Sequence, residues 1–239
     1  MPEIVVLSGA GLSAASGVPT FRGPGGWWRG RDATELATPE AFSDDPDLVL
    51  EFYGARRAAL AGIEPNDGHR ALARLQATLG ADRVWLVTQN VDGLLQAAGR
   101  ELGLSLTVVE MHGTLWSVRC AQDADHPRVS ATLVAPEARG TCTVCGGLLR
   151  PDIVWFGEQP FAMDEIRDAL LDCDTFVSVG TSGLVYPAAS FVRVAAYGGA
   201  RCIEVNPTPT GGGFHEVLAE GAEVGLPRWV DGVLARAQG

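Results

Sequence analysis

The sequence lacks three features that would assign it at once to a class of protein. It contains no lysine, so its 18 basic residues are all arginine, and 29 acidic residues outnumber them. The net charge of −11 argues against a nucleic-acid partner, because such proteins need a basic surface. No apolar run approaches the roughly 18 residues of a membrane span. No basic leader or cleavage site precedes the first apolar run, so we expect a cytoplasmic protein without a membrane partner.

Cysteine is also scarce, with five residues in the whole chain. In an intracellular protein this number favours metal binding or burial over disulfide bonds. Cys173 and Cys202 lie in or beside apolar segments, and we predict that they are small core residues. The other three cysteines, at positions 120, 142 and 145, cluster in one stretch and are the candidates for a metal site.

The chain is 46% hydrophobic over 239 residues, which is enough to bury a substantial core. Apolar, β-branched runs alternate with helical patterns, and this alternation predicts an α/β protein with a doubly wound parallel sheet. The predicted strands cover residues 4–7, 84–87, 106–110, 153–158, 175–179 and 202–205. The predicted helices cover about residues 38–62, 68–79, 164–171, 187–197 and 227–237, with a short further helix ending near residue 98.

Residues 115–150 break this alternation. They contain two prolines and all three clustered cysteines, two of them in the run Cys142-Thr143-Val144-Cys145. We predict a small inserted module here, between the two segments of a main domain, residues 1–114 and 151–239. A helical insert at about residues 27–65 belongs to the main domain, and we expect the protein to be a monomer.

The first predicted strand ends in the turn Gly9-Ala10-Gly11-Leu12-Ser13. Glycine allows a tight turn and a close approach to a pyrophosphate at the start of a helix near Leu12. These two glycines are half of a dinucleotide-binding fingerprint, and a purely steric turn explains them equally well. A dehydrogenase would have a third glycine where Ala14 stands, so hydride transfer is the weakest interpretation. Phe21 and Arg22 follow in a loop, rich in glycine and proline, that could fold over a nucleotide.

Polar side chains also follow the ends of other predicted strands, which is where open α/β sheets bind ligands. They are Gln89, Asn90, Asp92, His112, Gly180-Thr181-Ser182 and Asn206. The pKa of histidine suits His112 to act as a general base, although a lone histidine after a strand is more often structural. Asn90 and Asp92 could instead cap the following helix. His69 and His215 lie in no comparable setting, and the sequence assigns them no role.

Residues 9–23, GAGLSAASGVPTFRG, resemble the opening signature of the sirtuins, the NAD-dependent protein lysine deacylases. The runs Thr88-Gln89-Asn90-Val91-Asp92-Gly93-Leu94, Met111-His112-Gly113 and Gly180-Thr181-Ser182 resemble the later signatures of that family, in the same order. The resemblance implies a Rossmann-like NAD-binding domain and the products nicotinamide and O-acyl-ADP-ribose. It implies that His112 is the base that activates a ribose hydroxyl. The NAD contacts that it implies are Gly9, Ala10, Gly11, Ser13, Phe21, Arg22, Gln89, Asn90, Asp92, Gly180, Thr181, Ser182 and Asn206.

Tyr53 and Arg56 resemble the Tyr-x-x-Arg signature of the sirtuin branch that removes succinyl, malonyl and glutaryl groups, the class III branch. A guanidinium can bind the acyl carboxylate through two hydrogen bonds, and a phenol can add a third. Without the resemblance, a solvated Arg56 and a Tyr53 at the core boundary would be the simpler interpretation. With it, we predict removal of succinyl and malonyl groups, and of acetyl groups as well.

The resemblance also places a peptide-binding cleft between two segments of the chain. The substrate contacts that it implies are Val154, Phe156, Gly157 and Leu184. There an acylated-lysine protein or peptide would add as an extended strand through main-chain hydrogen bonds. Sequence selectivity would therefore be broad.

The cysteine-containing module resembles a zinc ribbon with one ligand changed. Cys142 and Cys145 have the spacing of a zinc half-site, but the upstream half has Cys120 followed by Asp123 where the family usually has a second cysteine. Asp123 or His126 could complete a tetrahedral site, since zinc accepts both carboxylate and imidazole ligands. Alternatively, packing alone holds the module. We favour one structural zinc ion.

Two further interpretations use the same NAD site. A mono-ADP-ribosyltransferase would transfer ADP-ribose to protein, and a non-catalytic module would bind NAD without releasing nicotinamide. His112, in its position after a strand, argues against the second of these.

Overall fold

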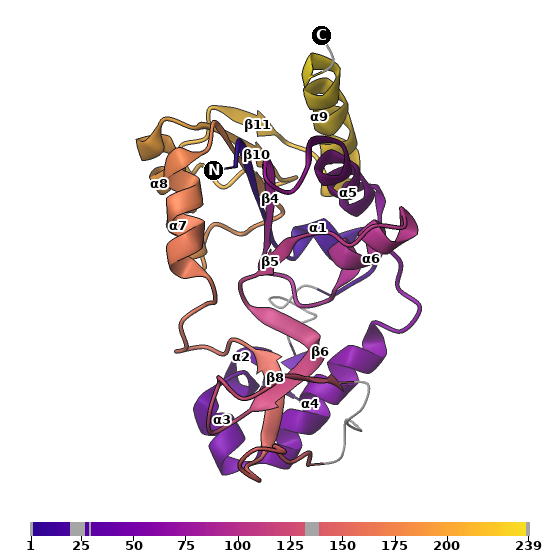
Figure 1. Cartoon of the computed structure of the whole chain (residues 1–239), viewed down its shortest axis with the longest axis vertical. Coiled ribbons are helices and arrows are strands. Elements are labelled where there is room, and N and C mark those ends of the chain that lie inside the picture. The colour runs from indigo at the N-terminus through magenta and orange to yellow at the C-terminus, as the bar shows by residue number, and fades with distance from the viewer. Residues whose placement is uncertain (1, 20–26, 29, 132–138, 238–239) are drawn as a thin grey trace.

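The computed structural model describes residues 2–19, 27–28, 30–131 and 139–237. Figure 1 shows a larger part built on the main sheet and, below it, a smaller part made of helices and a short antiparallel sheet. One of the passages between the two parts joins the end of β5 (Val108–Glu110) to the start of β6 (Gly113–Cys120).

The larger part contains a six-stranded sheet with the order β11-β10-β9-β1-β4-β5, and every pair in it is parallel. Besides β5, its strands are β1 (Ile4–Ser8), β4 (Val84–Thr88), β9 (Thr175–Val179), β10 (Arg201–Val205) and β11 (Glu216–Leu218). Ile4 pairs with Val84 on one side and with Thr175 on the other, so β1 is a central strand. All five residues of β1 are buried, as its continuous apolar sequence predicts.

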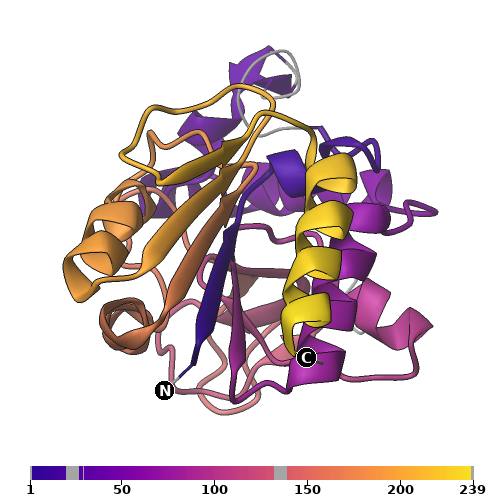
Figure 2. The same cartoon turned by 90° about the horizontal axis from the view of Figure 1, so that it is seen from above.

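Helices cover both faces of this sheet, which confirms the predicted doubly wound architecture (Figure 2). On one face are α5 (Asp67–Leu79), α6 (Leu94–Glu101) and α9 (Ala222–Ala237), and on the other are α7 (Met163–Asp172) and α8 (Phe191–Gly198). Alternate residues of β1 enter the two cores, with Ile4 in the first and Val5 in the second. Cys173 and Cys202 are both buried in the second core, as predicted.

The smaller part begins with a hairpin of β2 (Trp27–Trp28) and β3 (Arg31–Asp32), followed by three helices. These helices are α2 (Ala33–Leu36), α3 (Pro39–Asp44) and α4 (Pro46–Ala59). The single helix predicted for residues 38–62 is wrong, because the chain breaks at Asp45. Pro46 disfavours a helical conformation in the residue before it, and the Asp45 carboxylate accepts a 3.1 Å hydrogen bond from the Leu48 N–H and so caps α4.

The rest of the smaller part is an antiparallel sheet with the order β7-β6-β8, where β7 is Val129–Ser130 and β8 is Leu149–Ile153. The prediction that residues 153–158 resume the parallel sheet is therefore wrong. Ile153 ends β8, which pairs with β6, and residues 154–158 form turns. A short apolar run indicates a buried strand but does not say which sheet the strand joins.

Other elements also differ from the predictions. The predicted strand 106–110 begins only at Val108, as β5. The final helix α9 begins five residues early, at Ala222, and contains Pro227 in its interior. The edge strand β11 was not predicted, because its three residues are only half-buried or exposed. The predicted helix 187–197 begins with a 3-10 turn, Ala188–Ser190, before α8. Within the described residues, no helix has the length and apolarity to cross a membrane.

Candidate functional site

The turn after β1 packs directly against the turn after β9. The N–H of Gly9 donates to the Val179 carbonyl, and the N–H of Gly11 donates to the Gly180 carbonyl, both at 2.9 Å. A Cβ atom on Gly11 would lie 2.6 Å from the Cα atom of Gly180, and Gly180 itself has a φ of +58°. Glycine is therefore required at these positions by backbone packing alone. Ala10, between the two glycines, is exposed on the surface of this turn.

Ser13 is the centre of a buried hydrogen-bond network behind the glycine turn. Its hydroxyl donates to the Asp92 carboxylate at 2.7 Å and accepts from the Asn90 side-chain amide at 3.1 Å. It lies 3.2 Å from Nε2 of His69. Three residues from two other segments thus converge on one hydroxyl group, which is nearly inaccessible to solvent.

His69 is fully buried in this network, on α5 rather than after a strand, and the sequence assigned it no role. Its Nδ1 accepts a 3.2 Å hydrogen bond from the Asn66 N–H, so its hydrogen is on Nε2 and is donated to Ser13. Burial lowers the pKa of His69 to about 4, and the ring is neutral at pH 7. The Asn66 side chain caps the start of α5, with His69 at the third position, and this capping box was the signal in the sequence.

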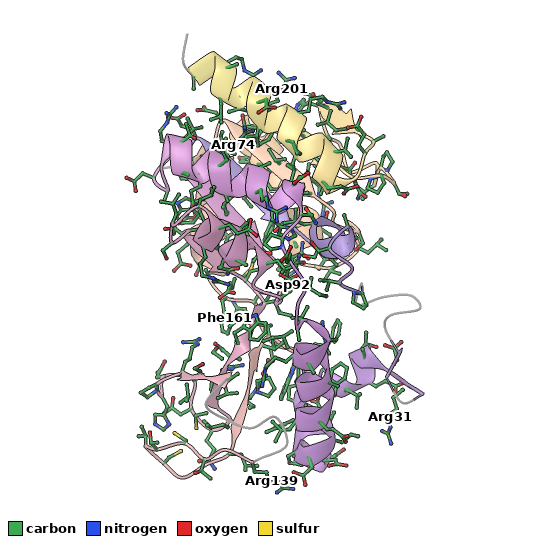
Figure 3. The ribbon with its side chains drawn as sticks, turned by 90° about the vertical axis from the view of Figure 1, so that its right-hand side faces the viewer. Arg31, Arg74, Asp92, Arg139, Phe161 and Arg201 are labelled. Atoms are coloured by element: carbon green, nitrogen blue, oxygen red, sulfur yellow. The ribbon has the colours of Figure 1, made fainter. Side chains whose placement is uncertain are left out.

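Asp92 lies between the two parts of the molecule (Figure 3) and caps the following helix, one of the two roles considered for it, while its contact with NAD stays a prediction. One carboxylate oxygen accepts the bond from Ser13, and the other accepts a 2.9 Å bond from the Leu94 N–H at the start of α6. Its carbonyl accepts a 2.7 Å bond from the Trp116 indole. Burial raises the pKa of Asp92, while the hydrogen bonds from Leu94 and Ser13 and the positive charge of Arg56 oppose the rise.

His112 follows β5 and is half-buried. Its Nδ1 lies 3.2 Å from the carbonyl oxygen of Gln89, which can only accept a hydrogen bond. Nδ1 therefore carries the hydrogen, and Nε2 keeps a lone pair that can accept a proton. Burial lowers the pKa of His112, and the bond to Gln89 only partly compensates, so the ring is neutral at pH 7. These are the properties of a general base.

Gln89 shows that this edge of the sheet is built for a polar ligand. The nitrogen of its side-chain amide is buried and has no hydrogen-bond partner among the described residues. An unpaired buried donor costs about 1–3 kcal/mol, so a ligand that supplies an acceptor would stabilise it. The ribose hydroxyls and the carboxamide of NAD are such acceptors, and the residues present therefore fit NAD. Phe21 and Arg22, the other predicted contacts, lie outside the described residues.

The predicted contacts near β9 and β10 hold one another in place. The amide of Asn206 donates a 2.7 Å bond to the carbonyl of Thr181, whose hydroxyl lies 2.9 Å from that of Ser178. The hydroxyl of Ser182 accepts a 3.3 Å bond from the Leu184 N–H. These bonds fix the shape of the turn beside Gly9 and Gly11, and its contacts with NAD stay predictions.

Tyr53 and Arg56 lie on α4, in the smaller part. Tyr53 is 1% exposed, and its hydroxyl oxygen accepts a 2.9 Å hydrogen bond from the Trp155 indole. Burial raises the pKa of Tyr53 to about 12, so the phenol stays protonated. The Arg56 guanidinium lies 5.7 Å from the centre of the Phe52 ring. Burial lowers the pKa of Arg56, while electrostatic interactions with Tyr53 and with the Asp92 carboxylate oppose the fall.

The predicted peptide-binding segments are exposed where side chains would meet a substrate. Phe156 is 42% exposed and Leu184 is 71% exposed. Gly157, beside Phe156, has a φ of +89° and is exposed. The N–H of Val154 is already used, because it donates to the carbonyl of His112 at 3.0 Å. Val154 thereby ties the segment to the candidate base.

The cysteine cluster contains a fourth candidate ligand. The ligand atoms of Cys120, His126, Cys142 and Cys145 all lie within 4.8 Å of one another. The Sγ atoms of Cys120 and Cys145 are 3.6 Å apart, close to the roughly 3.8 Å expected of two sulfurs on one tetrahedral zinc. The Nδ1 atom of His126 lies 3.3 Å from Cys142 Sγ, and its Nε2 atom lies 3.4 Å from Asp123.

Of the two fourth ligands left open by the sequence, the geometry selects His126. Three thiolates and an imidazole are a ligand set that structural zinc accepts, so the residues fit the metal. Asp123 stands behind the imidazole, where a carboxylate orients a metal-bound histidine. The catalytic candidate His112 is not part of this cluster.

Comparisons with known proteins agree with this site. The family model described as "Sir2 family" matches residues 9–187. The NAD-dependent protein deacylase of Shigella flexneri is 45% identical over 237 residues, which cover 98% of this chain and 84% of the relative. That of Aquifex aeolicus (strain VF5) is 46% identical over 210 residues, 87% of this chain and 84% of the relative.

Solved structures give the same result. A Sir2 homologue in complex with NAD superposes with a TM-score of 0.86 at 35% identity, covering 98% of this chain and 90% of the other. A complex described as Sir2, p53 peptide and NAD+ matches with a TM-score of 0.78 at 25% identity, covering 98% and 93%. The resemblance seen in the sequence is thereby confirmed: the chain belongs to the Sir2 family.

Proposed function

We propose that this chain is an NAD-dependent protein lysine deacylase that removes succinyl and malonyl groups as well as acetyl groups. The observation that carries the proposal is the state of His112, a neutral imidazole whose Nδ1–H is donated to the Gln89 carbonyl. The relatives named as NAD-dependent protein deacylases, at about 45% identity over nearly the whole chain, support the reaction class.

NAD, when bound, supplies the ribose carbon that accepts the acyl oxygen, and nicotinamide is the leaving group. The residues that would hold it are those of the glycine turn together with Gln89, Asn90 and Asp92. The unpaired amide nitrogen of Gln89 would donate to the ligand. Nε2 of His112 would accept a proton from a ribose hydroxyl, because Nδ1 already carries the hydrogen of this tautomer.

The substrate is an acylated lysine in a protein or peptide. The Sir2 complex with a p53 peptide and NAD+ supports this substrate class. The exposed side chains of Phe156 and Leu184 offer apolar contacts to a peptide. The net charge of −11 favours encounters with basic partners.

The acidic acyl groups are supported by Tyr53 and Arg56. The Arg56 guanidinium is partly buried beside Tyr53 on α4, and burial lowers its pKa. The carboxylate of a succinyl or malonyl group would add a negative charge next to this cation, and the protonated phenol of Tyr53 would donate a second hydrogen bond. An acetyl group is smaller and uncharged, so it would enter the same site without these contacts.

The decisive experiment mixes the purified protein with NAD and a lysine peptide carrying succinyl, malonyl or acetyl, and follows the peptide mass and nicotinamide release. We expect NAD-dependent loss of each acyl group, with one nicotinamide per acyl group removed, and no loss in His112→Ala. Failure to remove any of these groups would overturn the proposal. Labelled NAD that leaves a stable protein adduct would instead identify a mono-ADP-ribosyltransferase, and NAD binding without nicotinamide release would identify a non-catalytic module.

A further inference from the structure

Trp155 is a buried residue of the turn segment after β8, next to the exposed Phe156. Only 2% of its surface is accessible, and its indole nitrogen donates a 2.9 Å hydrogen bond to the hydroxyl oxygen of Tyr53. The two rings lie 6.5 Å apart, with their planes 32° from parallel. The bond joins segments that are 102 residues apart in the chain.

The direction of this bond is fixed by chemistry. An indole N–H can only donate a hydrogen bond, whereas a phenol can both donate and accept. The Tyr53 oxygen must therefore be the acceptor, and its own hydrogen must point away from Trp155. Among the described residues, no acceptor is hydrogen-bonded to that hydrogen, although the phenol is almost completely buried.

The geometry around Tyr53 restricts where this hydrogen can be used. Arg56 lies three residues further along α4, on the neighbouring face, and its charge acts on both Tyr53 and Asp92. Asp92 belongs to the Ser13 network, so Arg56 interacts electrostatically with both the phenol and that network. With Trp155 on one side, the phenol can present its hydrogen to a group that also meets the guanidinium.

Trp155 is itself held firmly in place. The Arg150 guanidinium lies over its ring, with its central carbon 3.3 Å from the ring centre, and makes bonds of 2.6 and 2.9 Å to the two carboxylate oxygens of Glu158. The same carboxylate accepts a 2.8 Å bond from the main-chain N–H of Trp155. The indole therefore has its face and its backbone fixed, and its N–H is aimed at Tyr53.

We propose that Trp155 is a positioning residue that sets acyl selectivity. By occupying the Tyr53 oxygen as an acceptor, its N–H directs the phenol hydrogen toward the carboxylate of an acidic acyl group beside Arg56. This inference rests on the proposed removal of succinyl and malonyl groups. An acetyl group has no carboxylate, so its removal does not depend on the bond between Trp155 and Tyr53.

The test is Trp155→Phe, which keeps an aromatic face under Arg150 but removes the N–H donor. Without that donor the phenol can rotate, so we expect the KM for a succinyl-lysine peptide to rise about 5- to 10-fold with little change in kcat. Both constants for the acetyl-lysine peptide should stay within about twofold of the wild type. In a Tyr53→Phe background, Trp155→Phe should have no further effect on desuccinylation.

Phe42→Leu is the matched control. The Phe42 ring packs against Trp155 with centres 5.3 Å apart, so this variant loosens the same packing without removing a hydrogen bond. We expect it to affect both peptides equally. Equal losses on both peptides in Trp155→Phe would overturn the proposal, because a packing role predicts them. An undiminished effect of Trp155→Phe in the Tyr53→Phe background would overturn it as well.

A measurement on the wild-type fold keeps the proposal falsifiable if Trp155→Phe fails to fold. Among the indole N–H signals in an NMR spectrum of 15N-labelled protein, the one that moves in Tyr53→Phe reports on Trp155. It should also move on addition of a succinyl-lysine peptide and not on addition of an acetyl-lysine peptide. The same movement with both peptides would overturn the inference.

The two proposals fail differently. A wild-type enzyme that removes acetyl but not succinyl groups would overturn the acidic-acyl assignment and, with it, this role of Trp155. A wild-type enzyme that removes succinyl groups through Tyr53, with Trp155→Phe unchanged on every substrate, would overturn the role of Trp155 alone.

Discussion

Ser13 and Asp92 lie 79 residues apart in the chain and share a 2.7 Å hydrogen bond at the edge of the sheet where NAD is expected. The bond joins the glycine turn to the polar segment after β4. Asn90 and His69 also donate to the Ser13 hydroxyl and so hold it in place. The Ser13 side chain in turn helps to position the Asp92 carboxylate.

Ser13→Ala should therefore weaken both the fold and the reaction. It leaves buried partners on Asp92, Asn90 and His69 unpaired, and we expect the free energy of unfolding to fall by about 1–3 kcal/mol. Misplacement of Asp92 should lower the rate of nicotinamide release by roughly 10- to 100-fold. Urea unfolding and a nicotinamide assay measure the two effects. Ser16→Ala, which removes only a 3.1 Å bond to Asn66, is the control, and equal activities of the two variants would contradict the prediction.

The pH dependence of the reaction should follow His112. Burial lowers its pKa below the ordinary value of 6.5, and the general base must be unprotonated. The rate should therefore be level near neutral pH and fall as the pH drops through the lowered pKa. A profile of kcat/KM against pH measures this, and a midpoint above pH 7 would show that another group controls the rate.

His112 and its neighbours illustrate what the sequence could predict. Alternating apolar runs fix where strands end, and parallel strands bring their ends to one edge, so Gln89, Asn90, Asp92 and His112 could be placed together at that edge without a structure. His69 was missed because it belongs to a helix rather than to a strand end. Its role arises from a tertiary contact with Ser13, at a separation of 56 residues, and the capping box with Asn66 marks only the start of the helix, not this contact.

The fold shows the same limit. The central strands β1, β4 and β9 were predicted almost to the residue, because a continuous apolar run is typical of a strand buried on both faces. The assignment of residues 153–158 to the same sheet failed because strand pairing is a tertiary choice. Gly113, at the start of β6, is an example of such a tertiary contact. It has a φ of +78°, and a Cβ atom there would lie 1.9 Å from the carbonyl oxygen of Asp152 on β8. The close approach of β6 and β8 at this point therefore requires glycine.

The stability of the protein should fall in mild acid because of His69. The ring has a pKa of about 4 when folded and about 6.5 when unfolded, so the unfolded chain binds its proton first as the pH falls. No effect is expected above pH 6.5, and about 2 kcal/mol of stability should be lost at pH 5. Urea unfolding at pH 7 and pH 5 measures the loss. His69→Gln should remove that part of the difference, and an identical difference in the variant would contradict this prediction.

Tyr53→Phe combined with Arg56→Met should change acyl preference. The double variant loses a charged and a neutral hydrogen bond to an acyl carboxylate, which corresponds to roughly a 10- to 100-fold fall in kcat/KM for a succinyl-lysine peptide. Activity on the acetyl-lysine peptide should be largely kept. Steady-state assays on both peptides test this, and equal losses on the two would argue that the pair supports the fold rather than the acyl group.

Substitution of His126 and substitution of Asp123 should affect metal binding by the cysteine cluster differently. We expect one zinc ion per chain in the purified protein, and its removal by a chelator should lower the thermal stability of the smaller part, since β6 ends at Cys120. His126→Ala should lose most of the metal, because it removes a ligand. Asp123→Asn should keep the metal but bind it roughly 10-fold more weakly, because it only orients the imidazole.

Elemental analysis and the absorption spectrum of the cobalt-substituted protein distinguish these roles. A site of three thiolates and one imidazole gives sulfur-to-cobalt bands that should persist in Asp123→Asn and collapse in His126→Ala. If the reverse held, Asp123 would be the fourth ligand, and the 3.4 Å contact between its carboxylate and Nε2 of His126 would then hold the imidazole outside the metal site.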